Sequence, residues 1–136
     1  MLVHADNLSF FPVHSFFSSY YDRPKGCELT LMTFRTPTPK SCGLVGSDNQ
    51  GIMTSFTEKP EKPEHDIANG AVCILSPKAL SKISTMAGAV DFSRDILPKF
   101  LGKTNVWHND VYHRDVGTPI AYKQAQVEIK LRSNLE

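Results

Sequence analysis

The chain has 136 residues, of which 40% are hydrophobic and 21% charged, and its formal net charge is +1. This length and composition indicate one globular domain with a real core and exclude an intrinsically disordered chain. The near-neutral charge, without a basic run interleaved with aromatic residues, gives no reason to expect a nucleic-acid partner. No apolar stretch reaches the length of a membrane span, and the N-terminal residues lack the pattern of a signal peptide. We therefore expect no membrane association and a cytoplasmic location.

Three helices are expected from apolar spacing and capping residues. The first has an aromatic-rich stripe that we interpret as core: Val13, Phe16, Phe17 and Tyr20. The second begins at Ser76-Pro77 and ends at Gly88, with four inward-facing residues: Ala79, Leu80, Ile83 and Met86. The last, over residues 120–131, follows Thr118-Pro119 and carries on one face Ala121, Ala125 and Ile129. Asp91 starts a shorter helix over residues 95–97, which Pro98 ends or bends.

Strands are expected over residues 2–5, 27–34, 42–45, 52–56, 72–75, 106–108 and 111–116. Asp48-Asn49-Gln50-Gly51 indicates a hairpin turn, with Gly51 where a positive φ is needed. An exposed charged loop over residues 57–64 follows, and Asn69-Gly70-Ala71 leads into a strand whose continuous hydrophobicity suits burial on both faces. Strands that alternate with helices in this way predict an α/β layered domain.

The three cysteines, Cys27, Cys42 and Cys73, are odd in number and show no Cys-x-x-Cys spacing. Each falls within or beside an apolar strand-like run, which is typical of buried, reduced thiols rather than of disulfides or zinc ligands. Three histidines invite a metal site but fall on separate elements without the cysteine or carboxylate pattern of zinc: His4, His108 and His113.

Asp6 and Asp115 are the first candidates for a functional site. Residues 2–5 read as a buried strand that ends at Asp6, and Asp115 closes another strand just before a helix start. In open α/β sheets, ligands bind at the carboxyl ends of strands, where the strand order reverses. Two carboxylates there can share a hard divalent cation whose other ligands are waters and substrate phosphates. The alternative is structural, because aspartate is common at strand ends and turns.

Four stretches, taken together in this order, resemble the sugar-1-phosphate nucleotidyltransferases, also called nucleotide-sugar pyrophosphorylases. They are Leu2-Val3-His4-Ala5-Asp6, Phe56-Thr57-Glu58-Lys59-Pro60, Ala68-Asn69-Gly70-Ala71-Val72 and Arg114-Asp115-Val116-Gly117-Thr118-Pro119. Each motif alone is common, whereas their conjunction at predicted strand ends is specific. The bacterial mannose-1-phosphate and heptose-1-phosphate guanylyltransferase-like members are the most similar. The resemblance implies a Rossmann-like, glycosyltransferase-A-like mixed sheet with flanking helices.

The resemblance further implies nucleotidyl transfer from a nucleoside triphosphate to a sugar 1-phosphate, giving a nucleotide sugar of the GDP-mannose type and pyrophosphate. Such transfers depend mainly on positioning and charge neutralisation. Mg²⁺ is the implied cofactor, with Asp6 and Asp115 as its ligands. These two residues and Lys59 are the implied catalytic residues, Lys59 neutralising the sugar phosphate as a flexible point charge.

Substrate binding is implied for four residues: Glu58, Lys59, Asn69 and Gly70. Glu58 would accept hydrogen bonds from sugar hydroxyls, and the Gly70 backbone would line the sugar pocket because a side chain there would block close approach. Structural interpretations stay open, since Glu58-Lys59 also occurs in solvated loops and Asn69-Gly70 is equally typical of a turn. Arg114 either contacts phosphate or points to the opposite face from Asp115, because neighbouring side chains alternate along a strand.

The family's glycine-rich first loop, G-G-x-G-T-R-L, and the Lys-Pro motif after it are absent from the sequence. No other glycine-rich strand-to-helix turn replaces this phosphate cradle. We therefore expect residues 1–132 to be a partial nucleotidyltransferase domain, incomplete at its N-terminal side. Residues 133–136 would be a tail in which Leu135-Glu136 is typical of a cloning scar. An exposed sheet edge would pair with another copy or with a missing N-terminal half.

The chain alone is expected to bind sugar phosphate weakly with Mg²⁺ and not to turn over. A competing function is a non-catalytic regulatory or interaction module that keeps the sugar site. The absent loop favours this module, whereas Asp6, Lys59 and Asp115 favour the enzyme. A glycosyltransferase that uses nucleotide sugars is a third option, but it typically has an Asp-x-Asp pair, and Asp6-Asn7-Leu8 supplies one carboxylate.

Overall fold

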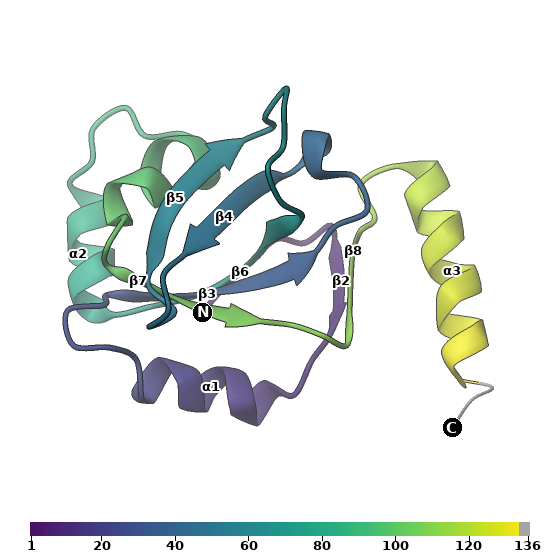
Figure 1. Ribbon diagram of the computed structural model, residues 1–136, viewed down its shortest axis with the longest axis horizontal. Coiled ribbons are helices and arrows are strands. Elements are labelled where there is room, and N and C mark those ends of the chain that lie inside the picture. Colours follow the sequence, from purple (N-terminus) through teal and green to yellow (C-terminus); the bar gives the residue numbers. More distant parts are fainter. Residues whose placement is uncertain (134–136) are drawn as a thin grey trace.

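The computed structural model describes residues 1–133, which form a mixed α/β domain (Figure 1). The main sheet has six strands: β5, β4, β6, β3 and β7 are neighbours in this order, and β1 also pairs with β6. Their bounds are Leu2–Val3 (β1), Leu29–Arg35 (β3), Gly43–Ser47 (β4), Met53–Glu58 (β5), Ile67–Leu75 (β6) and Thr104–His108 (β7). Strands β3 and β7 run parallel, whereas the other pairs are antiparallel. The α/β fold class expected from the sequence is confirmed.

A separate ribbon of two antiparallel strands, β2 (Asn7–Phe10) and β8 (Tyr112–Asp115), brings together segments that are more than 100 residues apart in the sequence. The helices are α1 (Val13–Tyr21), α2 (Pro77–Ser84) and α3 (Pro119–Ser133), with short helical turns η1 (Pro39–Ser41), η2 (Phe92–Ile96) and η3 (Leu97–Phe100). Helix α3 stands apart from the main sheet, beside β8 (Figure 1). In the described part of the chain, no helix is long and apolar enough to cross a membrane.

Two hydrophobic cores cover the two faces of the sheet. Along β3, Leu29 and Leu31 belong to the core that includes α2, η2 and η3, whereas Met32 belongs to the core that includes Phe16 of α1. Along β6, Cys73 belongs to the first core and its neighbours Val72 and Ile74 to the second. Because successive side chains of a strand point to opposite faces, this alternation confirms that residues 72–75 are covered on both sides.

Several local predictions are confirmed by hydrogen bonds at the ends of elements. The Ser76 hydroxyl caps α2 by accepting from the Ala79 N–H at 3.1 Å, and the Thr118 hydroxyl accepts from the Ala121 N–H at 3.1 Å. Gly51 has φ +76° in the turn between β4 and β5, as the hairpin requires. On α3, Ala125 is buried and Ile129 partly buried, which agrees with the expected inward face.

The N-terminal strand differs from the prediction. Strand β1 has only two residues, and Val3 is 50% exposed, so the expectation of a buried strand over residues 2–5 is wrong. The chain turns after β1, with the Asn7 N–H donating to the His4 carbonyl at 3.4 Å, and continues as β2. Asp6 therefore lies in a turn between β1, which pairs antiparallel with β6, and β2, and not at the carboxyl end of a parallel strand.

Other boundaries also differ. Strand β6 begins at Ile67, so Asn69-Gly70 lies inside the strand and does not precede it. Helix α2 ends at Ser84, before Gly88, and Leu80 is 52% exposed, so its expected inward orientation is wrong. In place of the short helix over residues 95–97, the π-helical turn η2 is followed by a 3-10 turn. Of the expected tail, Ser133 ends α3, and residues 134–136, including Leu135-Glu136, lie outside the described residues.

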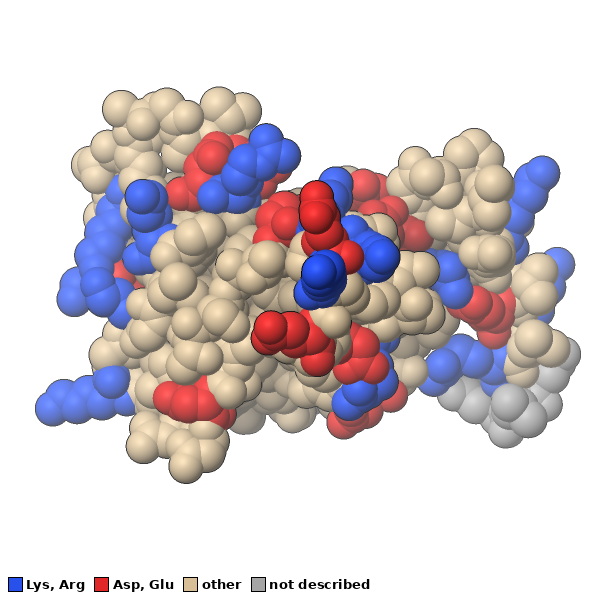
Figure 2. All heavy atoms as spheres, turned by 45° about the horizontal axis from the view of Figure 1, so that its top comes forward, with Lys and Arg blue, Asp and Glu red and all other residues tan. Residues whose placement is uncertain are grey.

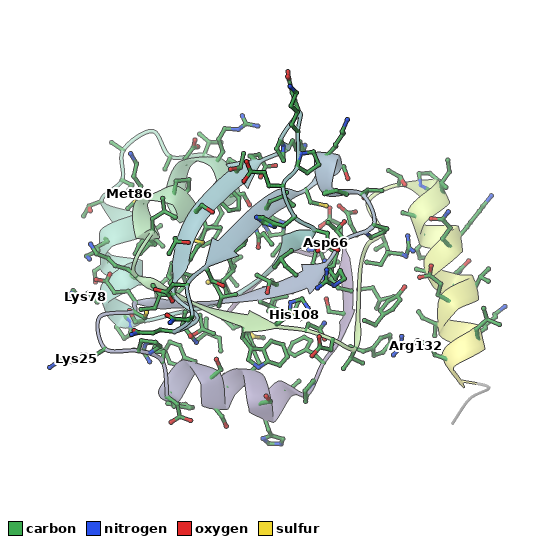
Figure 3. All side chains as sticks on the ribbon, in the orientation of Figure 1. Lys25, Asp66, Lys78, Met86, His108 and Arg132 are labelled. Atoms are coloured by element: carbon green, nitrogen blue, oxygen red, sulfur yellow. The ribbon has the colours of Figure 1, made fainter. Side chains whose placement is uncertain are left out.

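The buried Glu28 carboxylate, just before β3, forms ion pairs with two lysines of α2. The Glu28 side chain is 7% exposed; its Oε1 accepts from the Lys82 ammonium at 2.6 Å and lies 3.5 Å from the Lys78 ammonium. Its Oε2 is buried and has no hydrogen-bond partner among the described residues. Both lysines belong to α2, and Figure 3 labels Lys78 on this helix. The Lys82 hydrogen bond is the main cause that holds the pKa of Glu28 below its usual range.

We expect Glu28→Gln to destabilise the protein by about 1–2 kcal/mol at pH 7, because the charge-assisted hydrogen bond is lost. A lowered pKa in the folded state means that the stabilisation is present above the ordinary pKa of 4.5 and is lost as the pH falls through the folded-state pKa. Urea unfolding at pH 7 and pH 3 measures the difference, which should shrink at pH 3. Glu61→Gln, in the exposed loop, is the matched control, and an equal loss at both pH values would contradict the assignment.

Candidate active site

The β2–β8 ribbon brings Asp6 and Asp115 together. Asn7 lies opposite Asp115 in the register, and the Val116 N–H donates to the Asp6 carbonyl at 2.7 Å. A Cβ atom built on Gly117 would lie 3.0 Å from Asp115 Oδ1 and 3.2 Å from Asp6 Oδ2. The two carboxylates therefore converge on the space beside Gly117, although 109 positions separate them in the sequence.

A cavity of about 150 Å³ adjoins this carboxylate pair, and four of the residues predicted from the sequence line it: Asp6, Glu58, Asn69 and Asp115. Glu58 comes from the end of β5, and Asn69 from β6. Side chains that the sequence did not single out for this site also line the cavity, among them Cys42, Ser93 and His113. Segments from across the sheet, η2 and the ribbon therefore contribute to one cavity.

Two predicted residues do not line this cavity: Lys59 and Gly70. Lys59 is exposed and follows Glu58 directly, with its backbone N–H donating to the Cys42 carbonyl at 3.0 Å. A Cβ on Gly70 would lie 2.7 Å from Met32 Cε and 3.1 Å from the Met32 carbonyl oxygen, so close packing of β3 explains this glycine. Ligand contacts of Lys59 and Gly70 stay predictions.

Within residues 1–133, the non-glycine residues with positive φ are Lys59 (46°) and Ala71 (52°). Both lie at the site, since Ala71 lines the cavity and Lys59 is adjacent to Glu58. Ala71 sits where the β3–β6 register shifts, and the Asn69 Oδ1 accepts from its N–H at 2.8 Å. The Asn69 amide group also donates to Ser93 Oγ at 3.2 Å. Strained backbone that is supported in this way tends to cluster at functional sites.

Alternation along β8 sends neighbouring side chains to opposite faces. His113 and Asp115 line the cavity, whereas Arg114 binds the Glu128 carboxylate of α3 through two hydrogen bonds of 2.8 and 2.5 Å. The Tyr112 hydroxyl donates to the same carboxylate at 2.8 Å. Arg132 returns from α3 towards β8 (Figure 3), with its guanidinium 5.3 Å from the centre of the Tyr112 ring. Of the two alternatives for Arg114, the structure places it on the opposite face from Asp115.

The His113 imidazole lies between β2 and β3. Its Nδ1 is 2.7 Å from Ser9 Oγ, and its ring centre is 4.0 Å from that of Phe34. Burial lowers the pKa of His113 to about 4, against the opposing effect of the nearby Asp115 charge. Its position two residues before Asp115 was the one sequence signal that placed both side chains on the same face of a strand.

The carboxylates of the site provide few potential metal ligands. Among residues 1–133, no group of three or more His, Cys, Asp or Glu side chains is arranged to hold a metal ion. Zinc sites built entirely by protein need four such ligands, and catalytic zinc sites need three. Acidic and basic side chains lie interspersed over the face shown in Figure 2, and no single sign of charge dominates it.

Comparison with known proteins identifies the family. The sequence profile described as "Nucleotidyl transferase" matches residues 1–131. The chain belongs to the nucleotidyl transferase family. The glucose-1-phosphate adenylyltransferase of Thermotoga neapolitana is 28% identical over 82% of this chain and 29% of its own length. That of Desulfitobacterium hafniense is 29% identical over 80% of this chain and 30% of its own length.

Two solved structures show the same fold. A putative glucose-1-phosphate thymidylyltransferase from Bacillus anthracis, in complex with a sucrose, has a TM-score of 0.76 and 15% identity. It is matched over 92% of this chain and 52% of its own length. HddC from Yersinia pseudotuberculosis has a TM-score of 0.73 and 23% identity over 93% of this chain and 53% of its own. This nucleotidyl transferase chain thus spans about half the length of these structures and under a third of the curated relatives named above.

Cys42 provides a chemical probe of the cavity of this nucleotidyl transferase. It is partly exposed at the cavity wall, whereas Cys27 and Cys73 are buried, and burial raises the pKa of the Cys73 thiol to about 12. We expect iodoacetamide to modify Cys42 in the native protein and the other two thiols only after unfolding, because the thiolate is the nucleophile. Mass spectrometry of digests measures this order. Cys42→Ser is the control, and native labelling of Cys73 would contradict the prediction.

Gly117→Ala tests the convergence of the two carboxylates. The added methyl would force Asp6 or Asp115 to move by a few tenths of an ångström. A displacement of about 1 Å can cost 100-fold in function, so if the chain binds Mg²⁺ as the sequence resemblance implies, we expect roughly three- to tenfold weaker Mg²⁺ binding. Calorimetric titration with Mg²⁺ measures the change. Gly88→Ala, at φ +78° with open space around its Cβ, is the control for a general loss of stability. Unchanged Mg²⁺ affinity in Gly117→Ala would contradict the expectation.

Proposed function

We propose that this chain forms the sugar-phosphate side of a sugar-1-phosphate nucleotidyltransferase. In this reaction a phosphate oxygen of the sugar 1-phosphate attacks the α-phosphorus of a nucleoside triphosphate, and the bond to the departing pyrophosphate breaks. The products are a nucleotide sugar and pyrophosphate. The observation that carries the proposal is the convergence of Asp6 and Asp115 beside a cavity lined by Glu58 and Asn69, in a chain of the nucleotidyl transferase family.

Asp6 and Asp115 are the proposed ligands of Mg²⁺. The donor set fits this ion, because Mg²⁺ is commonly held by one or two carboxylates and completes its shell with waters and substrate phosphates. When bound, the ion would neutralise phosphate charge and align the reacting groups. Asp115 Oδ1 accepts from the Gly117 N–H at 2.7 Å, which orients this carboxylate before any ligand arrives. The backbone of the β2–β8 ribbon holds Asp6 beside it.

The roles of the other predicted residues follow from their positions. Glu58 lines the cavity and is the proposed acceptor for sugar hydroxyls. Lys59 is exposed at the end of β5 and is the proposed partner of the sugar phosphate, reached by its flexible stem. The Asn69 side chain is already bonded to Ala71 and Ser93, which supports a role in shaping the pocket.

Sugar and base specificity are separate questions. The curated relatives are named for glucose 1-phosphate and adenylyl transfer, which supports testing glucose 1-phosphate beside mannose 1-phosphate. The GDP-mannose type suggested by the sequence motifs stays a prediction. Because the chain covers less than a third of these relatives, we propose the overall activity for the complete enzyme and only sugar-phosphate binding for residues 1–133. The absence of a glycine-rich phosphate loop from the sequence supports this division.

The first experiment measures the binding of glucose 1-phosphate and mannose 1-phosphate by calorimetry, with and without Mg²⁺. We expect weak, Mg²⁺-dependent binding, and no release of pyrophosphate from a nucleoside triphosphate. Asp6→Asn and Asp115→Asn should each weaken Mg²⁺-dependent binding roughly 10- to 100-fold, the effect of losing a charge-assisted contact. Asp22→Asn, in the loop after α1, is the matched control. Binding that ignores Mg²⁺ would favour the non-catalytic module, and pyrophosphate release by this chain would refute its inactivity.

A second experiment tests Lys59. Lys59→Ala should weaken sugar 1-phosphate binding by roughly tenfold, because a phosphate loses one charged donor. Lys62→Ala removes an exposed lysine three residues away in the same loop and should leave the affinity unchanged. Equal affinities of the two variants would show that Lys59 is only a solvated loop charge, which is the structural alternative for this residue.

A further inference from the structure

His113 is a partly buried titratable side chain of the site that the proposed function leaves without a role. Its imidazole lines the same cavity as Asp6 and Asp115, on the same face of β8 as Asp115. Contact with the Phe34 ring at 4.0 Å between ring centres limits its reorientation. The β2–β8 register places Ser9 directly opposite His113, which explains why these two side chains meet.

The partners available to Ser9 indicate the direction of its contact with His113. Ser9 Oγ and His113 Nδ1 are 2.7 Å apart, a length at which either the hydroxyl or the ring N–H can donate. If Nδ1 carried the ring proton instead, this N–H would donate to Ser9 Oγ. The hydroxyl hydrogen of Ser9 would then have no protein acceptor. Ser9 Oγ has no second hydrogen-bond partner in the described part of the chain. A neutral imidazole that accepts at Nδ1 must carry its proton on Nε2.

A neutral N–H donor would complement the other groups that line the cavity. Its carboxylates from Asp6, Glu58 and Asp115 only accept hydrogen bonds when ionised. The Asn69 amide group gives one of its two N–H donors to Ser93, and its oxygen accepts from the Ala71 N–H. An uncharged N–H from His113 would supply a donor for a ligand oxygen without adding a positive charge beside the proposed cation site.

We propose that His113 is a specificity-determining residue of this cavity: its Nε2–H donates to an oxygen of the bound sugar phosphate, and Ser9 fixes the tautomer that makes this possible. The proposal rests on the proposed function for the identity of the ligand. It assigns Ser9 as a positioning residue that acts through His113. A ligand that lacks an accepting oxygen at this point would be discriminated against, because a donor would be left unpaired.

The tautomer is tested without any ligand. Long-range ¹H–¹⁵N correlation spectra of the protein at pH 7.5 distinguish a protonated Nε2 from a protonated Nδ1. We expect the Nε2–H tautomer for His113 and a mixture of tautomers in Ser9→Ala, because the locking hydroxyl is gone. His14, exposed on α1, is the internal reference. A His113 ring protonated at Nδ1, or a Ser9→Ala spectrum identical to that of the unaltered protein, would overturn the role of Ser9.

The ligand contact is tested with glucose 1-phosphate and mannose 1-phosphate in the presence of Mg²⁺. His113→Gln places an amide N–H near the position of Nε2, whereas His113→Asn places its amide near Nδ1 and leaves the cavity without this donor. We expect His113→Gln to bind within about threefold of the unaltered protein and His113→Asn roughly tenfold more weakly, the usual effect of one neutral hydrogen bond. Thermal unfolding of both variants separates this effect from a loss of folding.

The outcomes separate this proposal from the proposed function. Equal binding by the two variants, with binding lost in Asp6→Asn, would overturn the role of His113 and leave the proposed function standing. If the unaltered chain binds neither sugar phosphate, the proposed function and the ligand contact of His113 both fail, and the tautomer spectra still decide the role of Ser9. If both His113 variants unfold, a shift of the His113 Nε2 resonance on addition of sugar phosphate to the unaltered protein decides the contact.

Discussion

The pairing of β2 with β8 is the constraint on which the candidate site depends. It joins residues 7–10 to residues 112–115, with Asn7 opposite Asp115. The Val116 N–H donates a hydrogen bond to the Asp6 carbonyl, and the carboxylates of Asp6 and Asp115 face the space beside Gly117. Because backbone hydrogen bonds set this register, the distance between the carboxylates follows from the ribbon and requires no contact between the two side chains. A methyl group at position 117 would lie against both aspartates, so one of them would have to shift.

The two faces of strand β8 make different contacts: one lines the cavity and the other binds α3. Its residues 113 and 115 line the cavity, whereas Tyr112 and Arg114 reach the single carboxylate of Glu128 on α3. Helix α3 otherwise stands apart from the main sheet (Figure 1). This carboxylate therefore fastens the helix to the strand that carries Asp115. The hydrogen bonds with Arg114 lower the pKa of Glu128, so the attachment is strongest where this side chain is ionised.

Backbone strain is concentrated around the cavity. Lys59 and Ala71 adopt left-handed conformations that cost on the order of 1 kcal/mol each for residues other than glycine. At Ala71 two interactions offset the cost of this conformation. Its N–H donates to the Asn69 side chain, and the residues that follow it in β6 pair with β1. Lys59 belongs to the Glu58-Lys59 motif, and Ala71 directly follows Asn69-Gly70.

The sequence by itself determined the elements whose signals are local. The caps Ser76 and Thr118 and the glycine of the hairpin turn depend on neighbours within a few residues and were predicted correctly. Helical spacing located α1 and α2, but Val13, Phe17 and Leu80, expected to face inward, are 50%, 36% and 52% exposed. The motifs also identified four of the residues that line the cavity. Only the tertiary structure decided how Asp6 meets Asp115, why Gly70 packs on Met32, and that His113 and Cys42 belong to the site. These facts depend on strand register and on contacts between distant segments. Strand β2 (Asn7–Phe10) was not predicted from the sequence, because a four-residue strand has no partner until residues 112–115 are folded against it.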